Sequence, residues 1–196
     1  MSILVLTSDT LIGTAAAGNI EYDGQFFGTD SAGSRAQLQR IVRATAVAST
    51  SGTSIDFTSL PSWIKRITVM LSAVSTNGAG NMRIQIGTGG TPTTSGYVCM
   101  SMNIATAGNA ALSGTAGFDA FIGTASYSIN GAIRIQNITG NTWVAEGTLG
   151  NVTTTSNLAS IAGTVTLGGA LNFLRFTTTT GTDTFDAGTV NIIYEG

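Results

Sequence analysis

Short runs in which apolar and polar residues alternate recur along most of this chain. In a strand successive side chains point to opposite faces, so Ile67, Val69 and Leu71 are expected on one face. Turn-forming residues such as Gly, Asn, Ser and Thr separate the runs. Many short strands joined in this way predict an all-β fold, an antiparallel β-sandwich of jelly-roll type. The clearest runs are 66–71, 82–86, 132–136, 143–146, 164–167, 171–176 and 190–194.

The N-terminal part has a different pattern. Asp23-Gly24 lies between the strand-like segments 20–22 and 25–27, which predicts a β-hairpin with a type I′ turn. Segment 34–42 fits either a short helix capped by Ser34 or an extended connector, and 44–53 is either the first strand of the sandwich or a linker. We therefore expect an arm with a β-hairpin at residues 1–45, which docks on an assembly or clasps a neighbouring subunit. The β-sandwich would then span 46–196.

Two shorter segments have local predictions of their own. Pro61 near the start of 59–65 predicts one helical turn, with Trp63 and Ile64 closing the end of the core. The glycine-rich segment 87–90 is followed by no Gly-Lys-Ser/Thr sequence, so it is interpreted as a hairpin loop and not a phosphate-binding loop.

Charge is scarce for a chain of 196 residues. Only 9% of the residues are charged, against about 25% in an average soluble domain, and the formal net charge is −2. A surface of this kind suits burial against further copies of the chain, so the composition favours an oligomer. The weak negative charge gives no electrostatic attraction for nucleic acid. No run of 18 apolar residues occurs, and 1–6 lacks the basic start of a signal peptide, so neither membrane insertion nor a signal is expected.

Residue types that commonly carry catalysis are nearly missing. The chain has no histidine, which excludes Ser-His-Asp and Cys-His sites, and Lys65 is the only lysine. Cys99 lies in an apolar run and is expected to be a buried, inert thiol. The carboxylates are scattered; Asp183 and Asp186 fit either turn capping or a shared cation, with capping favoured. We therefore predict no catalytic site, no metal site and no cofactor.

Two sets of residues are candidates for binding. Arg35, Arg40 and Arg43 suit a partner surface that carries carboxylates, or they are solvated loop charges. Three aromatic residues fit either a platform for a glycan or half-buried positions in strands, with the second favoured. They are Tyr97, Tyr127 and Trp143.

Three segments carry a resemblance to a known group of proteins. Segment 13–27, with Glu21-Tyr22-Asp23-Gly24, resembles a segment of bacteriophage structural proteins. Residues 52–57 together with 60–70, which include Pro61-Ser62-Trp63-Ile64-Lys65-Arg66, are similar to the opening of a β-sandwich module of phage tail and virion-surface proteins. Segment 181–196 is similar to the end of that module.

The resemblance implies a non-enzymatic component of the virion surface, typically trimeric and made in the host cytoplasm. The sandwich begins soon after the start of this sequence, without shaft repeats or heptads, which favours a capsid decoration protein of the cement or head-fibre type. The alternative is a tail-fibre or tail-tip subunit that recognises host surface glycans. A polysaccharide depolymerase ranks third, because long β-helices and clustered acids are typical of that class.

Overall fold

The computed structural model describes residues 17–22, 26–105, 108–125, 127–151, 153 and 156–196. The chain divides into two compact units, Met1–Arg40 and Ile41–Gly196. Every regular element in the described ranges is a β-strand, and every strand pair is antiparallel, which confirms the predicted all-β class. The second unit begins at residue 41, five residues before the predicted start of the sandwich, because the segment after Arg40 pairs with the C-terminal strand.

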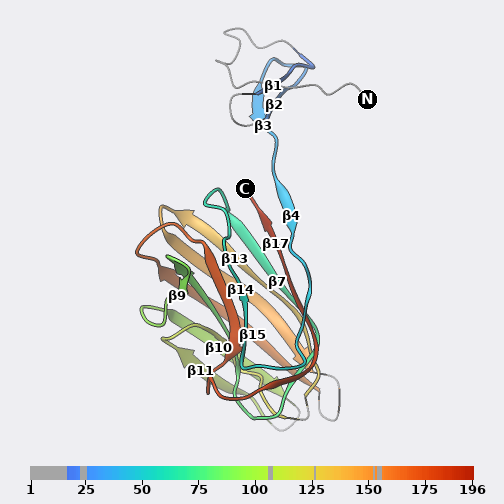
Figure 1. The fold of residues 1–196 in the computed structure, drawn as a ribbon, viewed down its shortest axis with the longest axis vertical. Helices are drawn as coiled ribbons and strands as arrows, with labels where there is room; N and C mark the ends of the chain where they lie inside the picture. Colours follow the sequence, from blue (N-terminus) through green and yellow to red (C-terminus); the bar gives the residue numbers. More distant parts are fainter. Residues whose placement is uncertain (1–16, 23–25, 106–107, 126, 152, 154–155) are drawn as a thin grey trace. The chain divides into compact units, whose positions relative to one another are not determined.

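The N-terminal unit contains a small three-stranded sheet (Figure 1). Its strands are β1 (Ile20–Tyr22), β2 (Phe26–Thr29) and β3 (Arg35–Gln37). Tyr22 lies opposite Phe26, so the predicted hairpin pairing is confirmed, while its turn at Asp23-Gly24 lies outside the described residues. The helix considered for 34–42 does not form. Residues 35–37 pair with β2 instead, since so short a helix has little stability of its own.

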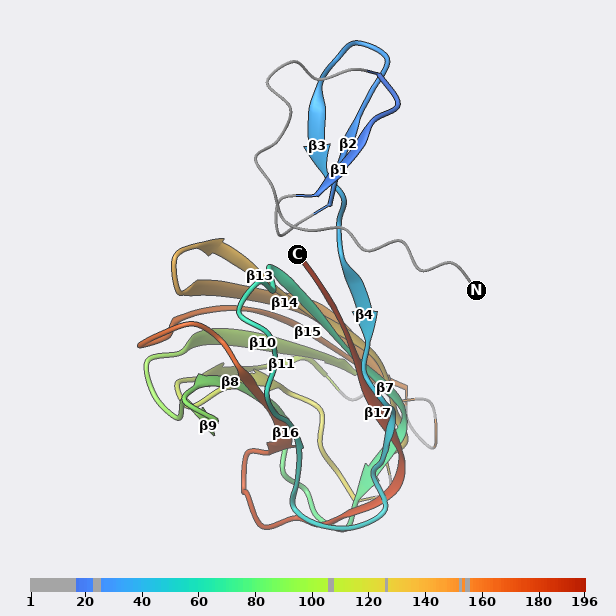
Figure 2. The same cartoon turned by 45° about the horizontal axis from the view of Figure 1, so that its top comes forward.

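The larger sheet of the second unit has nine strands. Their order is β11-β10-β15-β14-β13-β7-β17-β4, and β5 also pairs with β17. Figure 2 shows β13, β14, β15 and β10 side by side as one layer. The strands are β4 (Ile41–Arg43), β5 (Val47–Ala48), β7 (Arg66–Thr76), β10 (Val98–Ala105), β11 (Ala110–Gly114), β13 (Ile129–Thr139), β14 (Thr142–Asn151), β15 (Asn157–Thr166) and β17 (Phe185–Glu195).

The smaller sheet has the order β12-β8-β16-β6, with β9 paired to β8. Gly89 and Gly90 form the two-residue turn between β8 and β9, and both have positive φ, as a type I′ turn requires. The predicted hairpin loop is thus confirmed. The strands are β6 (Ser54–Phe57), β8 (Met82–Thr88), β9 (Thr91–Pro92), β12 (Phe118–Ala120) and β16 (Phe173–Thr178).

The two sheets enclose one hydrophobic core, and the chain passes repeatedly from one sheet to the other. The predicted shared face of Ile67, Val69 and Leu71 is fully buried. Ile64 is also buried and Trp63 packs against the core beside Tyr194, as expected. The helical turn predicted for 59–65 is instead a single hydrogen-bonded turn. No helix in the described ranges is long and apolar enough to cross a membrane.

Candidate functional site

The outer face of β10 exposes a row of apolar side chains. Val98, Met100, Met102 and Ile104 are 71%, 60%, 47% and 48% exposed, while the alternate residues face inward. Leu158 on β15 lies opposite Ile104 and is 42% exposed. These five residues are named here the β10 face.

Small neutral residues flank this row on both sides. Ala111 and Ser113 of β11 lie opposite Met102 and Met100, and on the other side Ser160 and Ala162 of β15 do the same. The described flanks therefore add no charge to the β10 face. An apolar strip rimmed in this way is the usual mark of a surface that another molecule covers.

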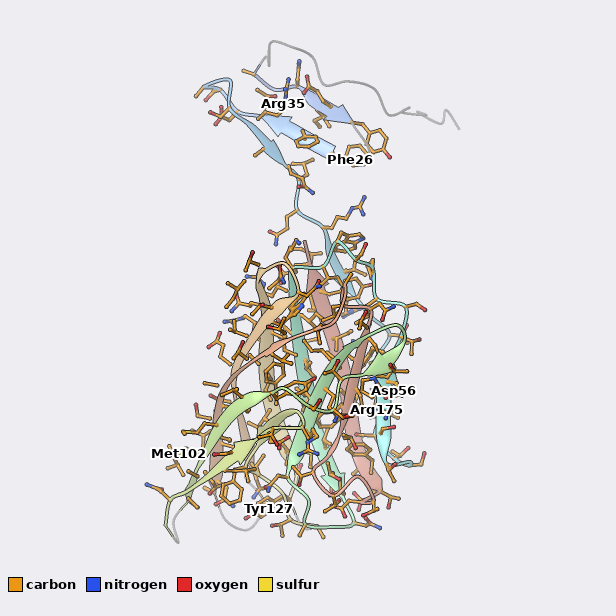
Figure 3. The ribbon with its side chains drawn as sticks, turned by 90° about the vertical axis from the view of Figure 1, so that its left-hand side faces the viewer. Phe26, Arg35, Asp56, Met102, Tyr127 and Arg175 are labelled. Atoms are coloured by element: carbon orange, nitrogen blue, oxygen red, sulfur yellow. The ribbon has the colours of Figure 1, made fainter. Side chains whose placement is uncertain are left out.

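The outer face of the smaller sheet differs from the β10 face, because it carries paired charges. Arg83 and Asp119 form two hydrogen bonds of 2.6 and 2.8 Å, and Arg175 forms two of 2.8 and 2.7 Å with Asp56. Figure 3 shows Asp56 and Arg175 side by side, on different strands from Met102. Paired charges of this kind suit contact with water. The larger sheet also has an exposed pair, Arg134–Glu146, so the apolar strip is confined to β10 and the end of β15.

The N-terminal unit also has an apolar face. The register places Ile20, Tyr22 and Phe26 on one side of its sheet, and Leu38 follows on the same side because its N–H bonds to the carbonyl oxygen of Phe26. Ile20, Phe26 and Leu38 are 70%, 43% and 48% exposed. These four residues are named here the arm face. Within the described residues of this unit no apolar side chain is fully buried, and the stability of so small a sheet depends on what covers it.

Of the three arginines predicted as docking residues, two belong to the N-terminal unit and one to the sandwich. Arg35 forms an ion pair with Glu21 at 2.6 Å, with the Glu21 side chain only 6% exposed. Arg40 is exposed at the end of the N-terminal unit, and Arg43 is exposed on β4 of the sandwich. Arg35 therefore has an ion-pair partner within the small sheet, and its role in docking stays a prediction.

The structure separates the three aromatic candidates for glycan contact. Tyr97 and Trp143 are 2% and 4% exposed and belong to the core, so neither offers a ring face to a ligand. Their assignment as glycan contacts is thereby corrected. Tyr127 is half-buried and lines a hollow at one end of the sandwich, and Figure 3 shows it in the lower part of the view.

That hollow has a volume of about 390 Å³. It lies where the inward sides of β10 and β15 end, facing the segment that follows β12. Asn103 donates to the carbonyl oxygen of Phe121 at 2.9 Å, and Asn157 donates to the Tyr127 hydroxyl. Along the inward side of β10 the residues are Cys99, Ser101, Asn103 and Ala105, which are small or polar. This explains why the hydrophobic core ends here and polar side chains line the hollow. Sequence reasoning missed the two asparagines, because each sits in an otherwise ordinary strand.

The cysteine and the acidic residues discussed next have roles within the fold. Burial raises the pKa of the Cys99 thiol, as expected for an inert cysteine. Asp183 accepts a hydrogen bond at 2.7 Å from the N–H of Gly80, far away in the sequence, so it fixes a neighbouring loop and does not cap its own turn. Within the described ranges, no group of three or more Cys, Asp or Glu residues is placed to hold a metal ion. Each of five acids is paired with an arginine: Glu21, Asp56, Asp119, Glu146 and Glu195.

Fold and surface together define an all-β module with an apolar strip on its larger sheet. Comparisons of the chain with protein-family models, with curated proteins and with solved structures give no match.

Proposed function

We propose that this chain is a non-enzymatic structural subunit of a bacteriophage particle, which forms a homotrimer on the virion surface and decorates or stabilises the capsid. The observation that carries the proposal is the β10 face, an uncharged strip on the outer side of the larger sheet. The segments that resemble phage modules add support. Two of them meet in the fold as β7 and β17, joined by the Arg66–Glu195 ion pair.

A second copy of the chain is the partner that best fits the β10 face. Because the strip carries no charge, identical copies approach without repulsion, and burying each large side chain contributes about 1.5–3 kcal/mol. Met100 and Met102 are unbranched and adjust to one another across a symmetric contact. The sparse charge of the whole chain, 9% of residues, is consistent with such self-association.

The arm face is proposed to dock on another virion protein. Its exposed residues Ile20, Phe26 and Leu38 come from a sheet that is too small to stand alone. Arg40 is exposed at the end of the unit and is proposed to contact carboxylates of that protein. Truncation of residues 1–40 should therefore abolish incorporation into particles and leave the trimer intact.

Oligomeric state tests the first part of the proposal. We expect a trimer by light scattering at micromolar concentration, and dissociation to monomers in the double variant Met100→Lys/Met102→Lys. The matched control is Ile138→Lys, since Ile138 is also exposed (62%) but lies outside the strip. A monomeric wild type, or a double variant that stays trimeric, would overturn the assignment of this face. A structural map of the virion then tests whether the subunit lies on the capsid surface.

The hollow at Tyr127 favours a second candidate function, a tail-fibre or tail-tip subunit that recognises host surface glycans. In that case particles without the protein should keep their stability and lose host adsorption. If the protein is a capsid decoration protein, particles that lack it should lose stability and keep host adsorption. The two candidates share the trimer and differ in which property of the particle changes.

A further inference from the structure

We propose that the hollow beside Tyr127 is a binding site for a neutral saccharide. Its six polar or aromatic lining residues come from four separate segments of the sandwich, so the site exists only in the folded chain. They are Asn81, Asn103, Phe121, Thr124, Tyr127 and Asn157. The volume of about 390 Å³ falls in the range of small-ligand sites, about 300–1,000 Å³.

The polar groups of the lining are uncharged. No Asp, Glu, Lys or Arg belongs to the described lining of this hollow. Three carboxamides, the Thr124 hydroxyl and the Tyr127 hydroxyl each combine donor and acceptor capacity, which matches sugar hydroxyl groups that both donate and accept. An anionic or cationic ligand would lose its hydration here without gaining an opposite charge.

Two of the amides are held in place before any ligand arrives. The side-chain amide of Asn103 donates one hydrogen bond to the carbonyl oxygen of Phe121. The side-chain amide of Asn157, a residue only 8% exposed, donates one to the Tyr127 hydroxyl. The carbonyl oxygens of both amides remain as acceptors, and the Tyr127 hydroxyl keeps its proton to donate. Fixed groups of this kind reduce the entropy cost of binding.

The same hollow supplies apolar contact area. The rings of Phe121 and Tyr127 line it together with Ala105, Ala110 and Ile122. A saccharide has C–H faces as well as hydroxyl groups, and an aromatic ring packs well against such a face. A peptide would also use amide partners, so it is the competing ligand that the experiment must exclude.

Saturation-transfer NMR on the purified full chain tests the proposal. The probes are maltose, lactose, mannobiose and chitobiose as neutral saccharides, sialyllactose as an acidic one, and a mixed tetra-alanine and tetra-serine peptide sample. We expect transfer to at least one neutral disaccharide. Absence of transfer to all four, or transfer only to the acidic sugar or to the peptides, would overturn the proposal.

Two variants locate the site. Tyr127→Phe keeps the ring and removes the hydroxyl, and it should weaken binding about three- to tenfold, the effect of one lost hydrogen bond. Asn103→Ala should weaken it at least as much. The control is Asn141→Ala, which changes an amide in a different hollow, near Trp143. Unchanged binding in both site variants, or equal loss in the control, would contradict the assignment.

This inference needs only the folded sandwich and does not depend on the trimer or on the place in the particle. Thermal melts of each variant show whether the fold persists. If both Tyr127→Phe and Asn103→Ala melt like the wild type and still bind as tightly, the site is wrong even when the oligomer is as proposed. If binding occurs in a monomeric protein, the saccharide site stands and the assembly proposal fails.

Discussion

The hydroxyl of Tyr97 bonds to both backbone groups of Ile86. The N–H of Ile86 donates to the tyrosine oxygen at 2.9 Å, and the hydroxyl donates to the carbonyl oxygen of Ile86 at 3.0 Å. The Tyr97 ring meets the Phe118 ring edge-on at 5.0 Å. One side chain just before β10 therefore holds a strand of the opposite sheet, which links the two layers.

Replacing this hydroxyl tests the link. Tyr97→Phe keeps the ring and its contact with Phe118 but leaves the buried N–H of Ile86 without its partner. Leaving such a donor unpaired costs about 1–3 kcal/mol. Urea unfolding should show this loss in the free energy of unfolding, with an unchanged slope. A variant as stable as the wild type would mean that another group satisfies the Ile86 N–H.

The same residue predicts a dependence on alkaline pH. Burial raises the pKa of Tyr97 well above its ordinary value of 10, so the folded state favours the neutral hydroxyl. A group with a raised folded-state pKa contributes stability that is fully present below its unfolded-state pKa and is lost as pH rises above it. The stability difference between wild type and Tyr97→Phe should therefore shrink above about pH 10. A difference that is constant from pH 8 to pH 11 would contradict this reading.

Breaking the Arg83–Asp119 ion pair should lower the free energy of unfolding far more than breaking an exposed ion pair. The Asp119 side chain is 4% exposed and that of Arg83 is 17% exposed, whereas Arg134 and Glu146 are 52% and 55% exposed. Asp119→Asn leaves a guanidinium largely buried without its counter-charge, at a cost of about 3 kcal/mol. The control Glu146→Gln should cost less than about 1 kcal/mol. Equal losses in chemical denaturation would show that burial does not strengthen the inner pair.

Cys99 should react slowly in the native protein. Its side chain is 5% exposed, and desolvation raises the pKa of the thiol. Little thiolate is therefore present at neutral pH, and reagents reach it only after the strand opens. Labelling with a chromogenic disulfide should be at least tenfold slower in buffer than in concentrated urea. Comparable rates in the two conditions would place the thiol at the surface.

Several parts of the fold followed from local patterns. Alternation within 66–71 and 82–86 predicted strands and their buried faces, because side-chain direction in a strand has a period of two. The glycine-rich segment 87–90 predicted a hairpin loop, and in the structure Gly89 and Gly90 both adopt the positive φ that its turn requires. The helix considered for 34–42 failed because pairing with β2 outweighs the weak helix propensity of so short a segment.

The surfaces were harder to predict. In segment 98–105 large apolar residues alternate with smaller or more polar ones, and the alternation rule would turn the large ones inward. The sequence therefore does not show that Met100 and Met102 face outward. The hollow combines Asn103, Tyr127 and Asn157 from segments far apart in the chain, and only strand order and register bring them together. Aromatic type alone did not distinguish half-buried Tyr127 from the core residues Tyr97 and Trp143.

The position of β17 has a consequence for how the protein is made. This strand, at 185–195, lies between β7 and β4 in the larger sheet, and β5 also pairs with it. The sheet therefore stays incomplete until the ribosome has released residue 195. Until then β7 exposes an unpaired edge, and a nascent chain of this kind depends on dilution or on a chaperone to avoid pairing with its neighbours. Sequence-distant pairing of this sort also slows folding.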